Sequence, residues 1–245
     1  MKVVILCGGK GSRLASPTEN NPKPLAIVNG KPIIWHIMKI YMKYGFNDFV
    51  LPLGFGGDKI KEYFWNYEWK NKNFIKDTTN DDIKLLNKPE NWRITFVDTG
   101  IDTMTGGRIK KIEKYIDEDT FMLTYGDGLS DINIKTLLDY HNSKAKIATV
   151  TGIQRKSQYG ILTIENGIAK SFDEKSKLDG IINGGFFILN TKVFNYISDD
   201  ESCIFEQDPL KNLAKQLQLA VYLHKGYWLS IDTYKDLSIA NKTWK

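Results

Sequence analysis

The feature that most constrains this chain is a short apolar run that leads into three glycines. Five apolar residues, from Val3 to Cys7, follow one another without alternation, and Gly8, Gly9 and Gly11 come after them. An uninterrupted apolar run of this length predicts a strand buried on both faces, as at the centre of a parallel sheet. Glycines at its end allow the backbone to turn sharply or to approach a ligand closely.

Two interpretations of this glycine-rich loop are open from its residues alone. Backbone N–H groups in such a loop can bind an anion, and Lys10 and Arg13 add positive charge, which together favour a phosphate site. The alternative is a plain turn at a strand end. The spacing disfavours a P-loop, because Val4 stands where its first glycine belongs. It also disfavours a dinucleotide-binding loop, because Leu14 replaces the last glycine of that motif.

The rest of the chain alternates between predicted strands and helices. This order at short spacing predicts right-handed βαβ units and a parallel sheet. Beyond about residue 150, the pattern changes to a hairpin with an Asn166-Gly167 turn, whereas residues 67–92 are less regular and could form an inserted arm. We expect strands at 48–53, 93–97, 121–124, 146–151 and 181–189, and helices at 32–45, 58–66, 109–116, 132–141, 209–217 and 233–244.

Composition narrows the class of protein. The 245 residues are 42% hydrophobic and 26% charged, as is ordinary for a soluble globular protein of one large domain. The net charge of +5 comes from interleaved charges, which suits small anions better than nucleic acid. No apolar run is long enough for a membrane span, and the chain enters a strand with no room for a signal peptide. With only two cysteines, these features predict a cytoplasmic protein.

Three charged residues stand in positions that favour function. Lys23 lies between Pro22 and Pro24, which stiffen its base, so it could be aimed at a phosphate or could be an ordinary solvated lysine. Asp127 stands between two glycines at the end of a predicted strand, where it could face a ligand or form an Asp-Gly turn. Asp232 precedes the last predicted helix, where an N-cap is the alternative role.

Several segments together resemble the sugar-phosphate nucleotidylyltransferases, and within that family the glucose-1-phosphate cytidylyltransferases. They occur in the family's order and cover nearly the whole chain, and 97–108 carries the likeness to the cytidylyltransferase branch. Two positions depart from the family pattern, because Ser176 replaces a common proline and 228–231 lacks an expected one. The segments are Leu6 to Leu14, Pro22 to Pro24, Lys31 to His36, Val97 to Arg108, Tyr125 to Gly128, Ile182 to Phe187, and Asp232 with Thr233.

The resemblance implies a role for each candidate residue. Arg13 and Lys23 would be the catalytic residues that neutralise the triphosphate and the developing charge. Asp127 and Asp232 would bind Mg²⁺, which prefers hard oxygen ligands. The implied nucleotide-binding residues are Leu6, Gly8, Gly9, Gly11, Ser12, Arg13, Thr105, Gly106, Arg108 and Gly126. The implied sugar-phosphate-binding residues are Tyr125, Gly160, Glu174, Lys175, Asn183 and Gly184.

The implied reaction transfers a cytidylyl group from CTP to a sugar 1-phosphate, which we expect to be glucose 1-phosphate, in nucleotide-sugar and polysaccharide biosynthesis. The implied fold is Rossmann-like α/β, with a mixed, mainly parallel sheet flanked by helices and a small β-hairpin part. Residues 1–245 would form one domain, with nucleotide bound by about 1–150 and sugar phosphate by about 151–245.

Mg²⁺, CTP and the sugar 1-phosphate are the expected cofactor and substrates, without nucleic acid or membrane, and a homo-oligomer is left open. One alternative uses UTP or dTTP, or a phosphorylated acceptor that is not a sugar. An alternative of another class is a regulatory nucleotide-binding module without turnover.

Overall fold

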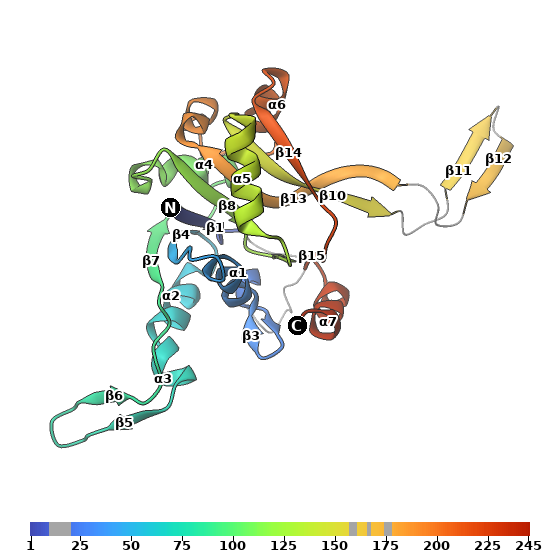
Figure 1. The fold of residues 1–245 in the computed structure, drawn as a ribbon. Coiled ribbons are helices and arrows are strands. Elements are labelled where there is room, and N and C mark those ends of the chain that lie inside the picture. The colour runs from blue at the N-terminus through green and yellow to red at the C-terminus, as the bar shows by residue number, and fades with distance from the viewer. Residues whose placement is uncertain (10–20, 157–160, 166–167, 174–177) are drawn as a thin grey trace.

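A seven-stranded sheet forms the centre of the protein. A computed structural model describes residues 1–9, 21–156, 161–165, 168–173 and 178–245 (Figure 1). The strand order is β14-β10-β13-β8-β1-β4-β7, and β13 runs antiparallel to both of its neighbours whereas the other pairs are parallel. The mixed, mainly parallel Rossmann-like sheet expected from the sequence is therefore confirmed. The sheet strands are β1 (Lys2–Leu6), β4 (Asp48–Leu53), β7 (Arg93–Asp98), β8 (Thr120–Tyr125), β10 (Ala148–Lys156), β13 (Leu178–Asn190) and β14 (Leu219–His224).

Helices cover both faces of this sheet. The first core contains side chains from α1, α2, α5 and α7, and the second contains side chains from α4, η3 and α6. Strand β1 contributes Val3 and Ile5 to the first core and Val4 and Leu6 to the second, which confirms that it is buried on both faces. The helices are α1 (Ile33–Met42), α2 (Gly57–Trp65), α3 (Tyr67–Asn71), α4 (Thr105–Lys111), α5 (Ile134–Lys144), η3 (Thr191–Tyr196), α6 (Asp208–Lys215) and α7 (Tyr234–Thr243).

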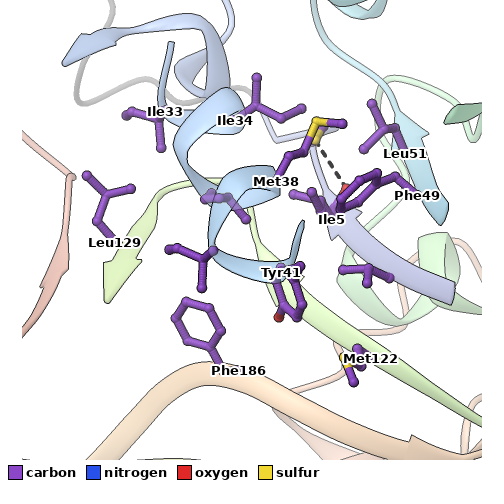
Figure 2. Close-up of a cluster of buried hydrophobic side chains, with 14 of the residues drawn as sticks. Ile5, Ile33, Ile34, Met38, Tyr41, Phe49, Leu51, Met122, Leu129 and Phe186 are labelled. Carbon is purple, nitrogen blue, oxygen red and sulfur yellow. Dashed lines mark hydrogen bonds between the residues drawn. The ribbon is translucent and has the colours of Figure 1, made fainter. Parts of the chain in front are cut away.

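Helix α1 is the main packing element of the first core. Its apolar positions recur at helical spacing, so Ile34, Met38 and Tyr41 lie on the face turned to the sheet. Figure 2 shows Met38 beside Ile5 and Phe49, and Tyr41 on the side of α1 nearer Phe186 and Met122. The ring of Tyr41 stacks on Phe186 with centroids 6.0 Å apart. This packing holds β1, β4 and β8 in place, and the pocket described below lies where β1 and β8 end.

The segment from 67 to 92 forms an arm. After α3, the strands β5 (Phe74–Lys76) and β6 (Ile83–Leu85) pair as an antiparallel hairpin that projects from the body, as Figure 1 shows. A second hairpin, of β11 (Ile161–Glu165) and β12 (Ile168–Asp173), lies beyond the ends of β10 and β13, well away from the first hairpin (Figure 1). The expected turn at 166–167 between its strands lies outside the described residues. Shorter pairs join β2 (Ile27–Val28) to β3 (Lys31–Pro32) and β9 (Gly128–Ser130) to β15 (Trp228–Ser230).

One helix differs from its expected position. The sequence predicted a helix over 109–116, whereas α4 begins at Thr105 and ends at Lys111, followed by the 3-10 turn η2 (Glu113–Tyr115). The first-turn amides of Gly106 and Gly107 both donate to the Cys203 carbonyl, 2.9 and 3.2 Å away. A helix start leaves such amides without partners within the helix, so this distant carbonyl stabilises it. The residues around Thr105 give no sign of this contact, so the sequence alone could not place the start of α4.

Candidate active site

A pocket opens at the carboxyl ends of β1 and β8. Its volume is about 260 Å³. This is where ligands bind in open α/β sheets, because strand ends and the loops after them leave a crevice there. Many of the expected nucleotide-binding residues line it, together with Lys23 and Asp127. The lining residues are Leu6, Cys7, Gly8, Gly9, Lys23, Pro24, Thr103, Met104, Thr105, Arg108, Tyr125, Gly126 and Asp127.

Two carboxylates meet one ammonium at the edge of this pocket. Lys23 begins the 3-10 turn η1 (Lys23–Leu25), and its Nζ lies 2.6 Å from Asp127 Oδ2 and 2.7 Å from Asp232 Oδ1. Burial disfavours the charged ammonium, but the attraction and hydrogen bonds of Asp127 and Asp232 outweigh it and raise the pKa of Lys23. The three residues that the sequence singled out separately thus form one cluster.

A strand pair brings the two aspartates together across 105 positions of sequence. Strand β9 follows Asp127 and pairs with β15, which ends shortly before Asp232, with Gly128 opposite Ser230. The amide of Ile231 donates to the Asp127 carbonyl at 2.9 Å, and the Ser230 hydroxyl donates to Asp232 Oδ2, also at 2.9 Å. Asp232 is therefore not the N-cap of α7. That role belongs to Thr233, which forms a capping box with Asp236.

The aspartate pair fits a divalent cation by its donor chemistry. Both carboxylates already place an oxygen within 2.7 Å of a single positive charge. No group of three or more His, Cys, Asp or Glu side chains that could hold a metal occurs within the described part of the chain. Mg²⁺ in phosphate chemistry commonly uses one or two carboxylates together with substrate oxygens. A two-carboxylate site beside a pocket is therefore compatible with a metal that is completed by a bound phosphate.

Arg108 holds the back of the pocket together. Its side chain is 4% exposed, and Nη1 donates to the carbonyls of Leu53 and Gly100 and to Thr99 Oγ1 at 2.6–3.0 Å. Nη2 donates to the carbonyls of Gly8 and Ile101 at 2.9 and 3.1 Å. Burial lowers the pKa of this guanidinium, although Asp98 opposes the shift. Arg108 thus lines the pocket, with its terminal nitrogens already bonded to loop acceptors.

Close backbone contacts explain two of the expected glycines. A Cβ at Gly8 would lie 2.2 Å from the Arg108 guanidinium carbon. A Cβ at Gly126 would lie 2.7 Å from the Leu6 carbonyl oxygen and 3.0 Å from Pro24. These positions therefore need glycine because β1, η1 and Arg108 approach one another here. Gly9 is different, because nothing lies within 4 Å of a Cβ built there.

A carboxylate that sequence reasoning missed joins the two sides of the site. Glu206 accepts a hydrogen bond from Thr105 Oγ1 through Oε2, at 2.6 Å, and one from the Tyr125 hydroxyl through Oε1, at 2.5 Å. Asn183 donates from Nδ2 to the Tyr125 oxygen at 3.1 Å. Burial, and then the charge of Glu206, raise the pKa of Tyr125, so its hydroxyl keeps its proton. No motif marks Glu206, because the segment 201–208 is unremarkable as sequence and only folding brings it here.

Of the remaining expected site residues, the structure describes Gly106 and Gly184, and the others lie outside the described residues. Gly184 is buried in β13 and its carbonyl accepts from Trp228 Nε1 at 2.8 Å, while its own Cβ position faces Ile153 at 2.7 Å. Gly106 lies in the first turn of α4 against Cys203. The structure therefore gives both glycines a packing reason. The expected site residues Gly11, Ser12, Arg13, Gly160, Glu174 and Lys175 lie outside the described residues.

No helix in the described ranges is long and apolar enough to cross a membrane. Such a helix would need about twenty apolar residues.

Comparison with known proteins assigns the family. The profile described as nucleotidyl transferase matches residues 2–245. A probable glucose-1-phosphate cytidylyltransferase of Bacillus subtilis (strain 168) is 56% identical over 244 residues, covering 100% of this chain and 96% of the relative. The glucose-1-phosphate cytidylyltransferase of Salmonella typhi is 42% identical over 248 residues, with the same two coverages.

Solved structures agree with this fold. The crystal structure of HddC from Yersinia pseudotuberculosis complexed with GMP-PN superposes with a TM-score of 0.72 at 24% identity, covering 100% of this chain and 99% of the other. A putative glucose-1-phosphate thymidylyltransferase from Bacillus anthracis, in complex with a sucrose, gives a TM-score of 0.72 at 19% identity, covering 98% and 94%. At these identities the likeness concerns the fold alone. With the full-length profile and sequence matches, it leads to one conclusion: the chain is an enzyme that belongs to the nucleotidyl transferase family.

Proposed function

We propose that the protein transfers the cytidylyl group of CTP to glucose 1-phosphate and releases pyrophosphate. The observation that carries this proposal is the convergence of Lys23, Asp127 and Asp232 on one edge of a pocket made by Leu6–Gly9 and Tyr125–Asp127. Charged groups so arranged suit a reaction whose substrates are both phosphates. The choice of CTP and glucose 1-phosphate follows the names of the two relatives that match the chain over its full length.

The reaction needs positioning and charge neutralisation. An oxygen of the sugar phosphate forms a bond to the α-phosphorus of CTP, and the bond from that phosphorus to the pyrophosphate oxygen breaks, with its electrons leaving on pyrophosphate. The attacking phosphate is already an anion at neutral pH, so no general base is required. Lys23 supplies a positive charge at the pocket edge, where it offsets phosphate repulsion. Arg13 would add a second charge.

Asp127 and Asp232 are proposed to hold Mg²⁺. When bound, Mg²⁺ would neutralise negative charge on the phosphate oxygens of CTP. The support from this chain is the pair of carboxylates that already share one cation. Cys7 takes no part, because burial raises the pKa of its thiol and its Sγ donates to the Ile5 carbonyl.

The nucleotide and the acceptor are proposed to occupy different walls of the site. The donor wall comprises Leu6, Gly8, Gly9, Thr105, Gly106, Arg108 and Gly126, with Gly11 and Ser12 as further predictions. The acceptor wall comprises Tyr125, Asn183 and Gly184, with Gly160, Glu174 and Lys175 as further predictions. Apart from Tyr125, this division corresponds to the expected nucleotide-binding part at about 1–150 and the sugar-phosphate part at about 151–245. The hydrogen bond from Asn183 to Tyr125 supports contact between these two parts of the chain.

A substrate matrix tests the proposal. The protein is incubated with Mg²⁺, one of CTP, UTP, dTTP, GTP or ATP, and glucose 1-phosphate or another sugar 1-phosphate, and pyrophosphate release is measured. We expect the fastest release with CTP and glucose 1-phosphate, loss of activity with excess EDTA, and recovery when Mg²⁺ is restored. Release with only another triphosphate would overturn the cytidylyl assignment. Full activity in EDTA would overturn the metal role.

A further inference from the structure

Glu206 lies between the proposed donor and acceptor walls without belonging to the pocket lining. Among the described residues that line the pocket are Thr105, at the first position of α4, and Tyr125, at the end of β8. Glu206 is not one of them. Its two carboxylate oxygens each accept one hydroxyl, from Thr105 at 2.6 Å and from Tyr125 at 2.5 Å. One side chain therefore spans from the nucleotide side to the acceptor side.

A neighbouring N–H group already uses one acceptor position on each of the two hydroxyls. The amide of Phe205 donates to Thr105 Oγ1 at 3.0 Å, so that oxygen is already used as an acceptor. The Nδ2 of Asn183 donates to the Tyr125 oxygen at 3.1 Å. The Asn183 amide has this orientation because its Oδ1 accepts from the Gly185 amide at 2.8 Å. Each hydroxyl donates its own hydrogen to Glu206, because an ionised carboxylate has no hydrogen to donate.

Position 206 therefore needs a group that accepts two hydrogen bonds, one from Thr105 and one from Tyr125. An ionised carboxylate meets that requirement, because both of its oxygens are acceptors. A glutamine at the same position would have the same shape but would offer one acceptor and one donor. One of the two hydroxyls would then meet an N–H group and would have to turn its own hydrogen away from position 206. The pattern of donors thus distinguishes glutamate from its isosteric amide, which a purely space-filling role would not.

We propose that Glu206 is a positioning residue that fixes the Thr105 and Tyr125 hydroxyls together and so aligns the nucleotide with the phosphorylated acceptor. The inference rests on the proposed function for the roles of the two walls. In-line attack depends on the relative placement of the two substrates, and small displacements between reacting atoms lower the rate strongly. A single carboxylate shared by both walls sets that placement directly.

The test uses Glu206→Gln and measures KM for each substrate separately, at saturating concentration of the other. Because the amide can satisfy only one hydroxyl at a time, KM should rise for both CTP and glucose 1-phosphate, by up to about tenfold, with a fall in kcat. Glu201→Gln is the matched control. Glu201 belongs to the same loop, but its carboxylate is 63% exposed and pairs with Lys111 at the surface, so its kinetics should equal those of the unchanged protein.

A second variant tests the link between the walls. In Glu206→Gln combined with Tyr125→Phe, the amide has only Thr105 left to satisfy and can turn its oxygen toward that hydroxyl. KM for CTP should then return to within about twofold of the unchanged protein, while KM for glucose 1-phosphate stays raised. A structural role alone would change the melting temperature of the variants without this selective recovery, so Tm is recorded for each.

Two results would overturn the inference. The first is a Glu206→Gln variant whose KM values and kcat all lie within twofold of those of the unchanged protein. The second is failure of the double variant to recover KM for CTP. Failure of the proposed function is distinguishable, because the substrate matrix on the unchanged protein would then identify another triphosphate or acceptor. The same kinetic comparison is then made with that pair.

Discussion

Two cationic side chains beside the same pocket are held in opposite ways. Arg108 is buried, and its terminal nitrogens donate to four carbonyls and one threonine hydroxyl. Lys23 lies at the pocket edge, and its two partners are the carboxylates of Asp127 and Asp232. The sequence predicted that both would bind substrate. The kind of acceptor indicates different roles for the two side chains. Arg108 binds backbone carbonyls and so holds the backbone in place. Lys23 binds carboxylates, which can exchange one cation for another.

From this difference we expect the stability of the fold to depend on Arg108, and turnover to depend on the cluster of Lys23, Asp127 and Asp232. Removing Arg108 takes one donor away from each of four carbonyls and removes a buried side chain, although the carbonyls of Gly8 and Leu53 keep donors in Phe55 and Thr99. The loss raises the free energy of the folded state. Changing the Lys23 cluster alters exposed or half-buried charges that the solvent can reach, so the fold should tolerate it.

The largest expected effect is loss of turnover in Asp127→Asn. The neutral amide keeps the shape but removes a negative charge from the proposed cation site, so kcat should fall by about a thousandfold, with the free energy of unfolding nearly unchanged. Pyrophosphate release and urea unfolding provide the two measurements. Asp131→Asn is the control, because Asp131 pairs with His224 outside the cluster. Near-normal turnover in Asp127→Asn would remove this residue from the metal site.

Arg108→Ala should show the reverse pattern. Losing the guanidinium removes one hydrogen bond from each of its acceptors and the packing of a buried side chain, so the free energy of unfolding should fall by about 3 kcal/mol. Arg108→Lys should lie between, because one ammonium cannot reach the same spread of acceptors. Urea unfolding of both variants checks this order. Undiminished stability in Arg108→Ala would contradict this structural role and leave Arg108 only its proposed place in the donor wall.

The variant Gly8→Ala tests the contact between Gly8 and the Arg108 guanidinium by changing Gly8 in place of Arg108. Its Cβ would meet the Arg108 guanidinium carbon at 2.2 Å, and the hydrogen bonds of that group resist displacement, so unfolding free energy should fall by about 2 kcal/mol. Gly9→Ala is the matched control, since its Cβ would enter open space, and its stability should be unchanged. Equal stabilities of the two variants would show that Arg108 gives way easily.

The smallest effect concerns His36, a buried basic group on α1. Its Nε2 donates to the Val28 carbonyl at 2.8 Å and its Nδ1 accepts from Trp244 Nε1 at 3.1 Å, an arrangement that needs the neutral ring. Burial lowers the pKa of His36 below its ordinary value, although the hydrogen bonds to Val28 and Lys31 oppose this. Below about pH 6.5 the unfolded chain therefore binds the proton more readily, and stability falls as the pH falls.

Urea unfolding at pH 7.5 and 5.5 measures this contribution, which is at most about 1.4 kcal/mol for each pH unit. The variant His36→Gln should lose less stability between the two values than the unchanged protein. An identical loss in both would show that His36 does not titrate differently on folding.

Much of the fold could be predicted, because it depends on local patterns. The apolar run Val3 to Cys7 predicted a central strand, and the helical spacing of Ile34, Met38 and Tyr41 predicted a helix, and both are present. The start of α4 was predicted four residues late, since its first-turn amides bond to Cys203 from a distant loop. Boundaries that depend on long-range hydrogen bonds leave no trace in the nearby sequence.

The sequence by itself determined the family, the sheet-forming segments and the identity of the charged candidates. Prolines restrict the backbone and glycines give it freedom, so they marked Lys23 and Asp127 before any contact was known. The resemblance implied that Asp232 joins Asp127, but only the tertiary structure showed that the β9–β15 strand pair brings it there and that Glu206 links Thr105 to Tyr125. Those contacts join residues about 80 to 210 positions apart, and only packing the sheet and its helices brings them within hydrogen-bonding distance.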